Sequence, residues 1–120
     1  WDTNPVSDNC LRAFLDSFGL KVFRRPVTDE EKANFVSFFK SRGTTARQDI
    51  IGLLLLSPQF LYHLENSGRE VPGRPGLYRL TGYEIASRLS FQYWESSPND
   101  ELLTAARNGT LDTDEGVRSV

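Results

Sequence analysis

The chain is poor in the residues that bind metals and form disulfides. It holds one cysteine, Cys10, one histidine, His63, and no methionine among 120 residues. A disulfide framework, a multi-cysteine metal site and a histidine-rich site are therefore excluded. The C-x-x-C-H attachment pattern is also absent, so this chain carries no covalently bound c-type haem. Cys10 borders an apolar helical stripe and lacks an activating motif, which predicts a buried, inert thiol.

The chain also lacks long apolar runs and any surplus of basic residues. Its longest apolar run, residues 50–56, is interrupted by Gly52 and is far too short to span a bilayer. The net charge is −2 and no basic stripe appears, which argues against nucleic acid as a partner. The remaining composition is typical of a globular protein of one domain, or of one and a fraction. Without an initiator methionine or a signal peptide, we expect the chain to be a piece of a longer protein.

The most distinctive stretch runs from Phe23 to Glu31. Pro26 has no amide hydrogen and pushes the preceding residue out of helical geometry, so the incoming helix must end near Phe23 or Arg24. Thr28 and Glu31 have the spacing of a capping box that begins the next helix. The stretch is therefore a corner between two helices. An alternative reading makes Arg24 and Arg25 a clamp for an anion or a carboxylate.

Apolar spacing and capping residues predict an all-α fold of about six helices, with orthogonal or irregular packing and no sheet. After an irregular lead-in over residues 1–6, four helices should form the main core. The expected ranges are 8–23, 29–42, about 45–56 with a capping box at its start, and 58–65.

Several core assignments follow from these ranges. Residues 50–56 are apolar all round, which is typical of a central buried helix. Phe60, Leu61 and Leu64 should face the core, with Tyr62 and His63 nearer the surface. A lone histidine at a helix end is most often a hydrogen-bonded surface group.

The second half of the chain begins with a segment rich in glycine and proline. Residues 66–76 have the composition of a loop, and residues 77–80 should be extended. We therefore expect a small domain over residues 1–65, a linker over 66–80, and the first helices of a second, truncated domain over 81–120.

Two complete helices are expected in that second domain, over 82–94 and 98–108, followed by the start of another in 112–120. Thr81 and Glu84 form a capping box at the start of the first of these helices. Arg88 follows Glu84 by four residues, the favourable order for an exposed ion pair. Ser97-Pro98 should begin the next helix, and Asn108-Gly109 should end it.

Several of these motifs coincide with a known family. Phe23 to Glu31, followed by residues 55–62, resembles a small helical domain of unknown function from large multidomain proteins of planctomycetes and related bacteria. Residues 83–90, with Trp94, Ser97-Pro98, residues 100–103 and Gly109, resemble the opening of the larger domain that follows it in that family. Asn99 departs from the family pattern, in which aspartate is common. The resemblance covers roughly residues 9–120.

The resemblance implies a function only in outline. Such proteins often carry a cytochrome c-like domain, so c-type haem would belong to another domain of the parent protein, and this chain would hold no cofactor. It implies a periplasmic, cell-envelope or exported location. The implied partners are other domains of the parent protein, a polysaccharide or a redox partner.

Two hypotheses follow. In the first, the chain is a non-catalytic structural or interaction module, with exposed apolar surface in residues 91–120. In the second, it forms one wall of the site of an oxidoreductase or a carbohydrate-active enzyme. No catalytic or metal-binding residue can be assigned from the sequence. The polar and aromatic residues that could line a ligand site are Arg24, Arg25, Tyr62, His63, Glu84, Arg88 and Trp94.

Overall fold

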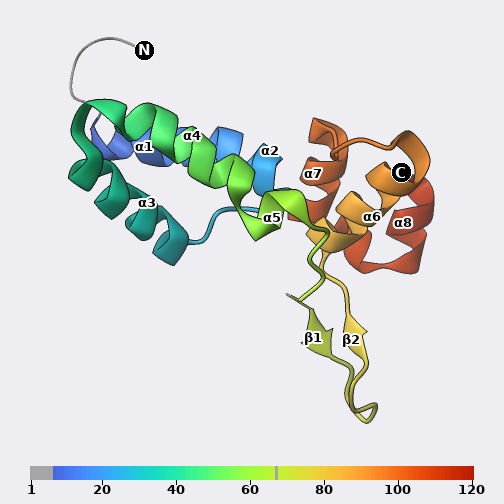
Figure 1. Cartoon of the computed structure of the whole chain (residues 1–120). Coiled ribbons are helices and arrows are strands. Elements are labelled where there is room, and N and C mark those ends of the chain that lie inside the picture. Colours follow the sequence, from blue (N-terminus) through green and yellow to red (C-terminus); the bar gives the residue numbers. More distant parts are fainter. Residues whose placement is uncertain (1–6, 67) are drawn as a thin grey trace. The chain divides into compact units, whose positions relative to one another are not determined.

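The computed structural model describes residues 7–66 and 68–120 and shows an all-α protein with one very small sheet (Figure 1). The expected lead-in over residues 1–6 lies outside the described residues. The chain divides into two compact units, Trp1–Leu61 and Tyr62–Val120. The expectation of an all-α fold is confirmed. The expectation of no sheet is wrong, because β1 (Arg69–Glu70) and β2 (Tyr78–Arg79) pair in antiparallel fashion.

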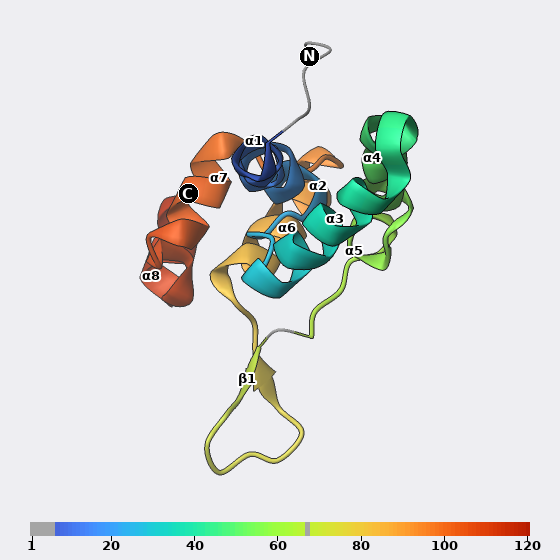
Figure 2. The same ribbon diagram turned by 90° about the vertical axis from the view of Figure 1, so that its left-hand side faces the viewer.

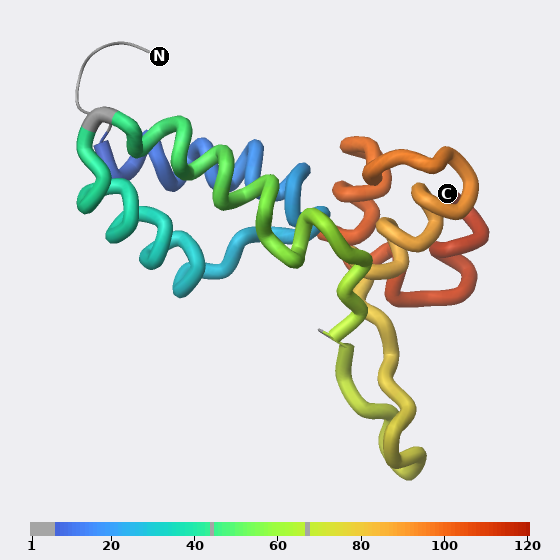
Figure 3. The backbone as a smooth tube through the Cα atoms, viewed as in Figure 1, coloured from blue at the N-terminus to red at the C-terminus, as the bar shows by residue number. Residues whose placement is uncertain are grey.

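The first unit opens with a helical run that extends from residue 8 to residue 23, as expected. It consists of α1 (Asp8–Phe14), a π-helical segment (Leu15–Gly19) and α2 (Leu20–Phe23), and Figure 3 traces it as one continuous coil. The Ser7 side chain caps its start by accepting a hydrogen bond from the Cys10 amide. Gly19 lies against Val27, because a Cβ atom at Gly19 would come within 2.6 Å of the Val27 side chain. The backbone at Gly19 can approach the corner this closely only without a side chain.

Cys10 is exposed at the surface of α1, so the expectation of a buried thiol is wrong. The buried residues Leu11, Leu15 and Val22 of this run lie on one side of the coil. Cys10 lies one position before Leu11, about 100° around the helix, and this turn is enough to bring it to solvent.

The next helix, α3 (Asp29–Arg42), begins and ends as expected. Thr28 and Glu31 complete a capping box at its start, and it ends at Gly43, whose φ of 63° is a conformation that glycine adopts without strain. Lys40 reaches Asp8 of α1 at 2.7 Å, and Lys32 reaches Asp16 at 2.6 Å. These two ion pairs connect α3 to the opening run.

The start of α4 (Ala46–Leu56) differs from the expected capping box. Thr45 ends a 3-10 turn (Gly43–Thr45), its backbone is helical, and its side chain caps no amide. The Thr45 hydroxyl instead donates to Asp49 at 2.8 Å. Because the 3-10 turn runs directly into α4, no extended residue remains at which an N-cap could form.

The last helix of the first unit, α5 (Pro58–Leu61), is shorter than the expected 58–65. Ser57 keeps extended geometry at this junction, and its hydroxyl donates to the Leu54 carbonyl at 2.7 Å. Phe60, Leu61 and Leu64 are exposed by 38%, 54% and 41%, so the expectation that they face the core is wrong. Tyr62 and His63 are exposed, as expected.

The core of the first unit combines all of its longer helices, and α3 runs alongside α4 (Figures 1 and 2). Phenylalanines of α1, α3 and the π-helical segment pack around it. The buried core residues are Leu11, Leu15, Val22, Phe23, Val27, Val36, Ile50 and Leu54.

Only one side of α4 contributes to this core. Ala46, Ile50 and Leu54 are buried, whereas Ile51, Leu55 and Leu56 are exposed. The expectation of a helix buried all round is therefore wrong. An apolar run marks a buried helix only where neighbouring elements surround it.

The second unit contains α6 (Gly82–Trp94), α7 (Asp100–Arg107), a 3-10 turn (Thr110–Asp112) and α8 (Asp114–Ser119). Its core is formed by Ala86, Leu102, Ala106 and Leu111. Gly82 allows α6 to cross α7 closely, since a Cβ atom there would lie 3.2 Å from the Ala106 carbonyl oxygen. The expected helix ranges are close to those observed.

The start of α7 differs from the expected one. Ser97-Pro98 does not begin the helix. Asn99 is the N-cap, with its side-chain oxygen accepting from the Leu102 amide at 2.9 Å. Asparagine caps helices as well as aspartate does, so the departure from the family pattern leaves the cap intact. The helix ends before Gly109, as expected, and Gly109 itself has a φ of 73°. None of the described helices is long and apolar enough to cross a membrane.

The two faces of α4 predict opposite responses to mutation. Leu54→Ala removes a side chain with 0% exposure and should lower the free energy of unfolding of the first unit by about 2–5 kcal/mol. Leu56→Ala removes the same atoms from a side chain that is 74% exposed, and should change the free energy of unfolding by less than about 0.5 kcal/mol. Urea titrations followed by amide NMR intensities of residues 7–61 would measure both. Equal losses in the two variants would contradict the described burial.

Candidate functional site

Arg24 lies at the corner between α2 and α3 and is only 6% exposed. It takes the left-handed conformation, with a φ of 57°, which ends α2. Its guanidinium donates to the carbonyl oxygens of Gln59 at 2.6 Å and Phe60 at 3.3 Å. Burial lowers the pKa of Arg24 from its ordinary value. Arg24 therefore attaches α5 to the corner, by donating to backbone carbonyls.

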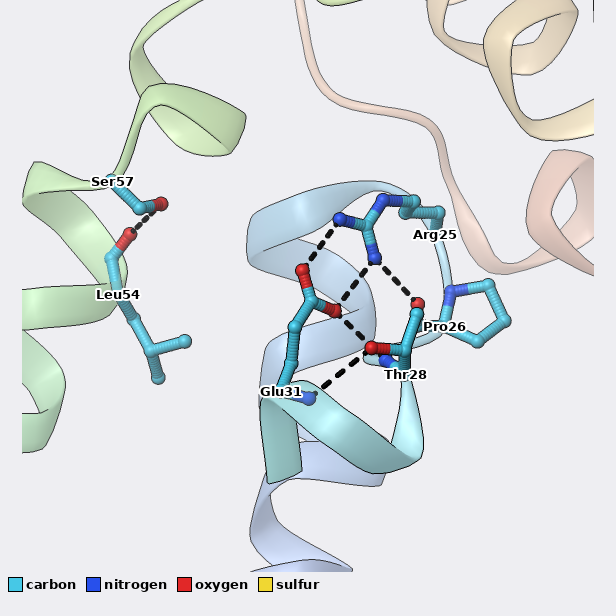
Figure 4. A network of polar contacts seen from close by, with 6 residues as sticks. All are labelled: Arg25, Pro26, Thr28, Glu31, Leu54 and Ser57. Carbon is cyan, nitrogen blue, oxygen red and sulfur yellow. Dashed lines mark hydrogen bonds and ion pairs between the residues drawn. The ribbon is translucent and has the colours of Figure 1, made fainter. Parts of the chain in front are cut away.

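Arg25 forms a compact polar cluster with the start of α3 (Figure 4). Its two terminal nitrogens donate to the two carboxylate oxygens of Glu31 at 2.8 and 2.9 Å, and one of them also donates to the Pro26 carbonyl at 2.9 Å. The same carboxylate accepts from the Thr28 amide at 2.8 Å. The Arg25 guanidinium also lies 5.4 Å from the centre of the Phe23 ring. The carboxylate that Arg25 clamps thus belongs to the chain itself.

Electrostatics in this cluster follow from the paired geometry. The hydrogen bond to Glu31 raises the pKa of Arg25. The hydrogen bonds from Arg25 and from the Thr28 amide lower the pKa of Glu31. Both shifts favour the charged forms, so the pair remains ionised at neutral pH. A permanently ionised, internally paired carboxylate is poorly suited to general acid or base catalysis.

In the second unit, Glu84 and Arg88 lie on α6 and contact different partners. Glu84 is 7% exposed, and its carboxylate accepts from the Thr81 amide at 2.8 Å and from the Thr81 hydroxyl at 2.9 Å. Arg88 donates from two nitrogens to the carboxylate of Glu65, which raises the pKa of Arg88. The expected ion pair between Glu84 and Arg88 is therefore wrong. Glu84 turns toward Thr81, the N-cap of α6. Arg88 instead forms two hydrogen bonds with Glu65, a partner that helical spacing cannot reveal.

The three aromatic candidates of the second unit lie at the surface. Tyr62 and Trp94 are exposed by 62% and 57%. The exposed His63 packs its ring against Phe91, with the ring centres 4.1 Å apart. His63 is thus a surface residue in a ring contact, where we expected a hydrogen bond.

The structure brings some candidates to partners that sequence reasoning did not assign to them. These partners are Glu31 for Arg25, Glu65 for Arg88, Phe91 for His63, and the carbonyls of Gln59 and Phe60 for Arg24. Only Glu31 had a local signal, through the capping-box spacing. In the described parts, residues 7–66 and 68–120, no group of three or more His, Cys, Asp or Glu residues is placed to hold a metal ion.

Comparisons with known proteins match each half of the chain separately. Residues 10–65 match the model of a family described as PSD5, protein of unknown function (DUF1595). Residues 80–120 match the model of a second family, PSD4, protein of unknown function (DUF1592). No curated protein and no solved structure matches the chain. Both halves are thus similar to domains of unknown function, and residues 66–79 lie between the two matches.

The Arg25–Glu31 pair predicts an acid-sensitive stability. A carboxylate whose pKa is lower in the folded state stabilises fully above its unfolded pKa of about 4.3, and this contribution is lost as the pH falls through the lower folded pKa. Glu31→Gln should lower the free energy of unfolding at pH 7 by about 1 kcal/mol, between the values for exposed ion pairs and for hydrogen bonds to charged groups. It should also reduce the loss of stability on acidification from about pH 5 to pH 3.

Urea unfolding followed by circular dichroism over this pH range would measure both effects. The matched control is Glu30→Gln, which removes the same charge from an exposed position in the same helical turn. The control should keep the pH dependence of the unmodified protein. The same loss on acidification in both variants would place the acid-sensitive group elsewhere.

Proposed function

We propose that the chain is a non-catalytic helical structural or interaction module of a larger exported bacterial protein. The observation that carries this proposal is the distribution of side chains over the surface. Apolar side chains are exposed on α4, α5 and α6. The charged candidate residues, by contrast, form helix caps, the corner contacts and ion pairs within the chain. An exposed apolar face is typical of a surface that packs against another protein element.

The outer face of α4 is the clearest such surface. At helical spacing, Leu55 and Leu56 fall on the side away from the buried Ile50 and Leu54, and the exposed Ile51 borders that side. Gly52 lies among them, and a Cβ atom there would meet nothing within 4 Å. The face is therefore apolar and low in relief at its centre, so another helix or sheet could approach the backbone closely. We refer to Ile51, Gly52, Leu55 and Leu56 as the outer α4 face.

The second unit also exposes apolar groups in the range that the module hypothesis expects. Tyr93 and Trp94 at the end of α6 are exposed by 68% and 57%, and Val120 by 57%. Adjacent exposed aromatic side chains provide large contact areas at low entropic cost.

The nature of the partner follows from the chemistry of these faces. These faces consist of aliphatic and aromatic side chains and carry no charged group. They are therefore better suited to contact other domains of the same parent protein than to bind a charged polymer. The resemblance extends the proposal: c-type haem would reside in another domain of the parent, and a polysaccharide or a redox partner would be the target of the assembled protein. The location would be the periplasm, the cell envelope or the exterior.

The alternative function, one wall of an oxidoreductase or carbohydrate-active site, requires polar groups that converge on a substrate. Arg24 and Arg25 instead donate to groups of the corner and of α5. Glu84 and Arg88 lie on the same helix, but one is buried against its N-cap and the other binds Glu65. These contacts favour a structural role for all four residues.

The size and location of the natural protein test the proposal directly. An antibody raised against this chain should detect, in fractionated cells of the source organism, a polypeptide much larger than 13.6 kDa. This polypeptide should be found in the periplasmic, envelope or extracellular fraction. A cytoplasmic band of about 13.6 kDa would contradict the proposal.

The outer α4 face gives a second test, within the parent protein. The amides of α4 should exchange their hydrogens more slowly in the parent than in the separate chain, because another domain covers the face. The double variant Leu55→Gln/Leu56→Gln should remove that difference, since two polar side chains would have to be buried without partners. Hydrogen exchange read by mass spectrometry would measure the effect.

Gln48→Ala is the matched control, because Gln48 lies on the same side of α4 and is already polar and exposed. It should leave the protection of α4 in the parent unchanged. Equal exchange of the α4 amides in parent and separate chain would show that no domain covers this face.

A further inference from the structure

The segment between the two units' helices contains a pre-ordered, basic β-hairpin. We call residues 69–79, which include β1 and β2, the arm. Figures 1 and 2 show the arm leaving the start of α6 as a two-stranded ribbon that ends in a loop. Neither the helix packing of the second unit nor the proposed module function uses it.

The loop of the arm consists of two consecutive turns built from the same dipeptide. Pro72-Gly73 and Pro75-Gly76 occupy the central positions, and the glycines have φ values of 75° and 80°. Each turn is closed by a backbone hydrogen bond of 3.1 Å, from Arg74 to Val71 and from Leu77 to Arg74. Proline followed by a glycine of positive φ is the pattern of a type II turn.

Further hydrogen bonds hold the loop to the strands. The Val71 amide donates to the Leu77 carbonyl at 2.7 Å, and the Gly76 amide donates to the Glu70 carboxylate at 2.8 Å. At the base, Gly68 lies so close to β2 that a Cβ atom there would come within 2.2 Å of the Arg79 carbonyl oxygen. Arg79 also donates to the Asp112 carbonyl at 2.9 Å. Much of the entropic cost of ordering this loop is therefore met before any partner binds.

The charge of the arm is opposite to that of the chain. The arm contains three arginines and one glutamate, which gives it a net charge of +2. Since the whole chain has a net charge of −2, the remainder carries −4. The single carboxylate of the arm, Glu70, already accepts from the Gly76 amide. Positive charge is thus concentrated on an element that projects from an acidic chain.

Two of these arginines face each other across the strands. The register places Arg69 directly opposite Arg79, and like charges in such a pair destabilise a sheet. Among the described residues, no group accepts a hydrogen bond from the side chain of Arg69 or Arg74 or forms an ion pair with it. A partner that brings carboxylates to this face would relieve the repulsion and use the idle donors.

The backbone of the arm indicates what kind of carboxylate partner fits. Because residues 71 and 77 form a hydrogen-bonded pair, the alternation of an antiparallel ladder turns the backbone groups of Glu70 and Tyr78 outward, to the two edges. Those groups match the main chain of an added strand. Tyr78 and Leu77, exposed by 59% and 47%, offer apolar contact beside it. A long polyanion such as DNA would offer no such backbone groups and would be repelled by the acidic remainder of the chain.

We infer that the arm binds an acidic, extended segment of a partner protein, which adds as a strand and pairs its carboxylates with Arg69, Arg74 and Arg79. The proposed module function concerns apolar surfaces of the helices. This inference concerns a different surface, so the experiments on the two can fail independently.

The experiment is an NMR titration of the 15N-labelled chain with the peptide Thr-Glu-Thr-Glu-Thr-Glu-Thr, whose glutamates alternate as on one face of a strand. We expect amide shifts confined to residues 69–79, with a Kd that weakens as the salt concentration rises. The same peptide with glutamine in place of glutamate should bind at least about tenfold more weakly. A heparin fragment and a short DNA duplex test the other polyanions.

The double variant Arg69→Gln/Arg74→Gln should raise the Kd for the glutamate peptide about tenfold or more and preserve the dispersion of the spectrum, since neither side chain supports the fold. The matched control is Arg107→Gln/Arg118→Gln, which removes the same charge from exposed positions of α7 and α8. The control should keep the Kd within twofold. The inference is overturned by an absence of shifts in the arm, by equal effects of the two double variants, or by tighter binding of heparin or DNA to the arm.

Discussion

The sharp exit from α2 at Arg24, imposed by Pro26, is the constraint on which the first unit depends. Proline at this position ends the incoming helix, and the left-handed backbone of Arg24 turns the chain toward α3. The Arg25–Glu31–Thr28 cluster then fixes where α3 begins. The side chain of Arg24 instead donates to backbone carbonyl oxygens of α5. One five-residue corner thus attaches three helices, and it uses both arginines to do so.

This double use explains why a conspicuous pair of arginines need not mark a ligand site. A guanidinium is suited to binding phosphate or a substrate carboxylate, but the same planar donors also match backbone carbonyls and internal carboxylates. Arg24 and Arg25 satisfy these internal acceptors. In the second unit, Glu84 at its N-cap and Arg88 at Glu65 follow the same rule. The four charged residues that stood out in the sequence thus contact groups of the chain itself, at caps, at the corner and in ion pairs.

Local signals predicted the elements well, whereas contacts between distant residues could not be predicted. The two capping boxes that begin α3 and α6, and the glycine that ends α3, follow from rules that act within a few residues, so local spacing revealed them. The pairs Arg88–Glu65 and Arg24–Gln59 join residues 23 and 35 positions apart, and no local spacing encodes them. The prediction of a capping box at the start of α4 was wrong for a different reason, because a 3-10 turn replaced the extended residue that a cap requires.

The burial of α4 was the most instructive failure, and it bears on function. Composition gave a helix that is apolar on every side, and the usual inference from this pattern is a central position in the core. The structure surrounds only the side that holds Ala46, Ile50 and Leu54. Leu56, at 74% exposure, places apolar surface in water at a cost of roughly 25 cal/mol for each Å². A sequence that places isoleucine and leucines on an outward face, with a glycine between them, is explained if another domain covers that face. The pattern that misled the prediction of burial is therefore the same pattern that supports a docking role.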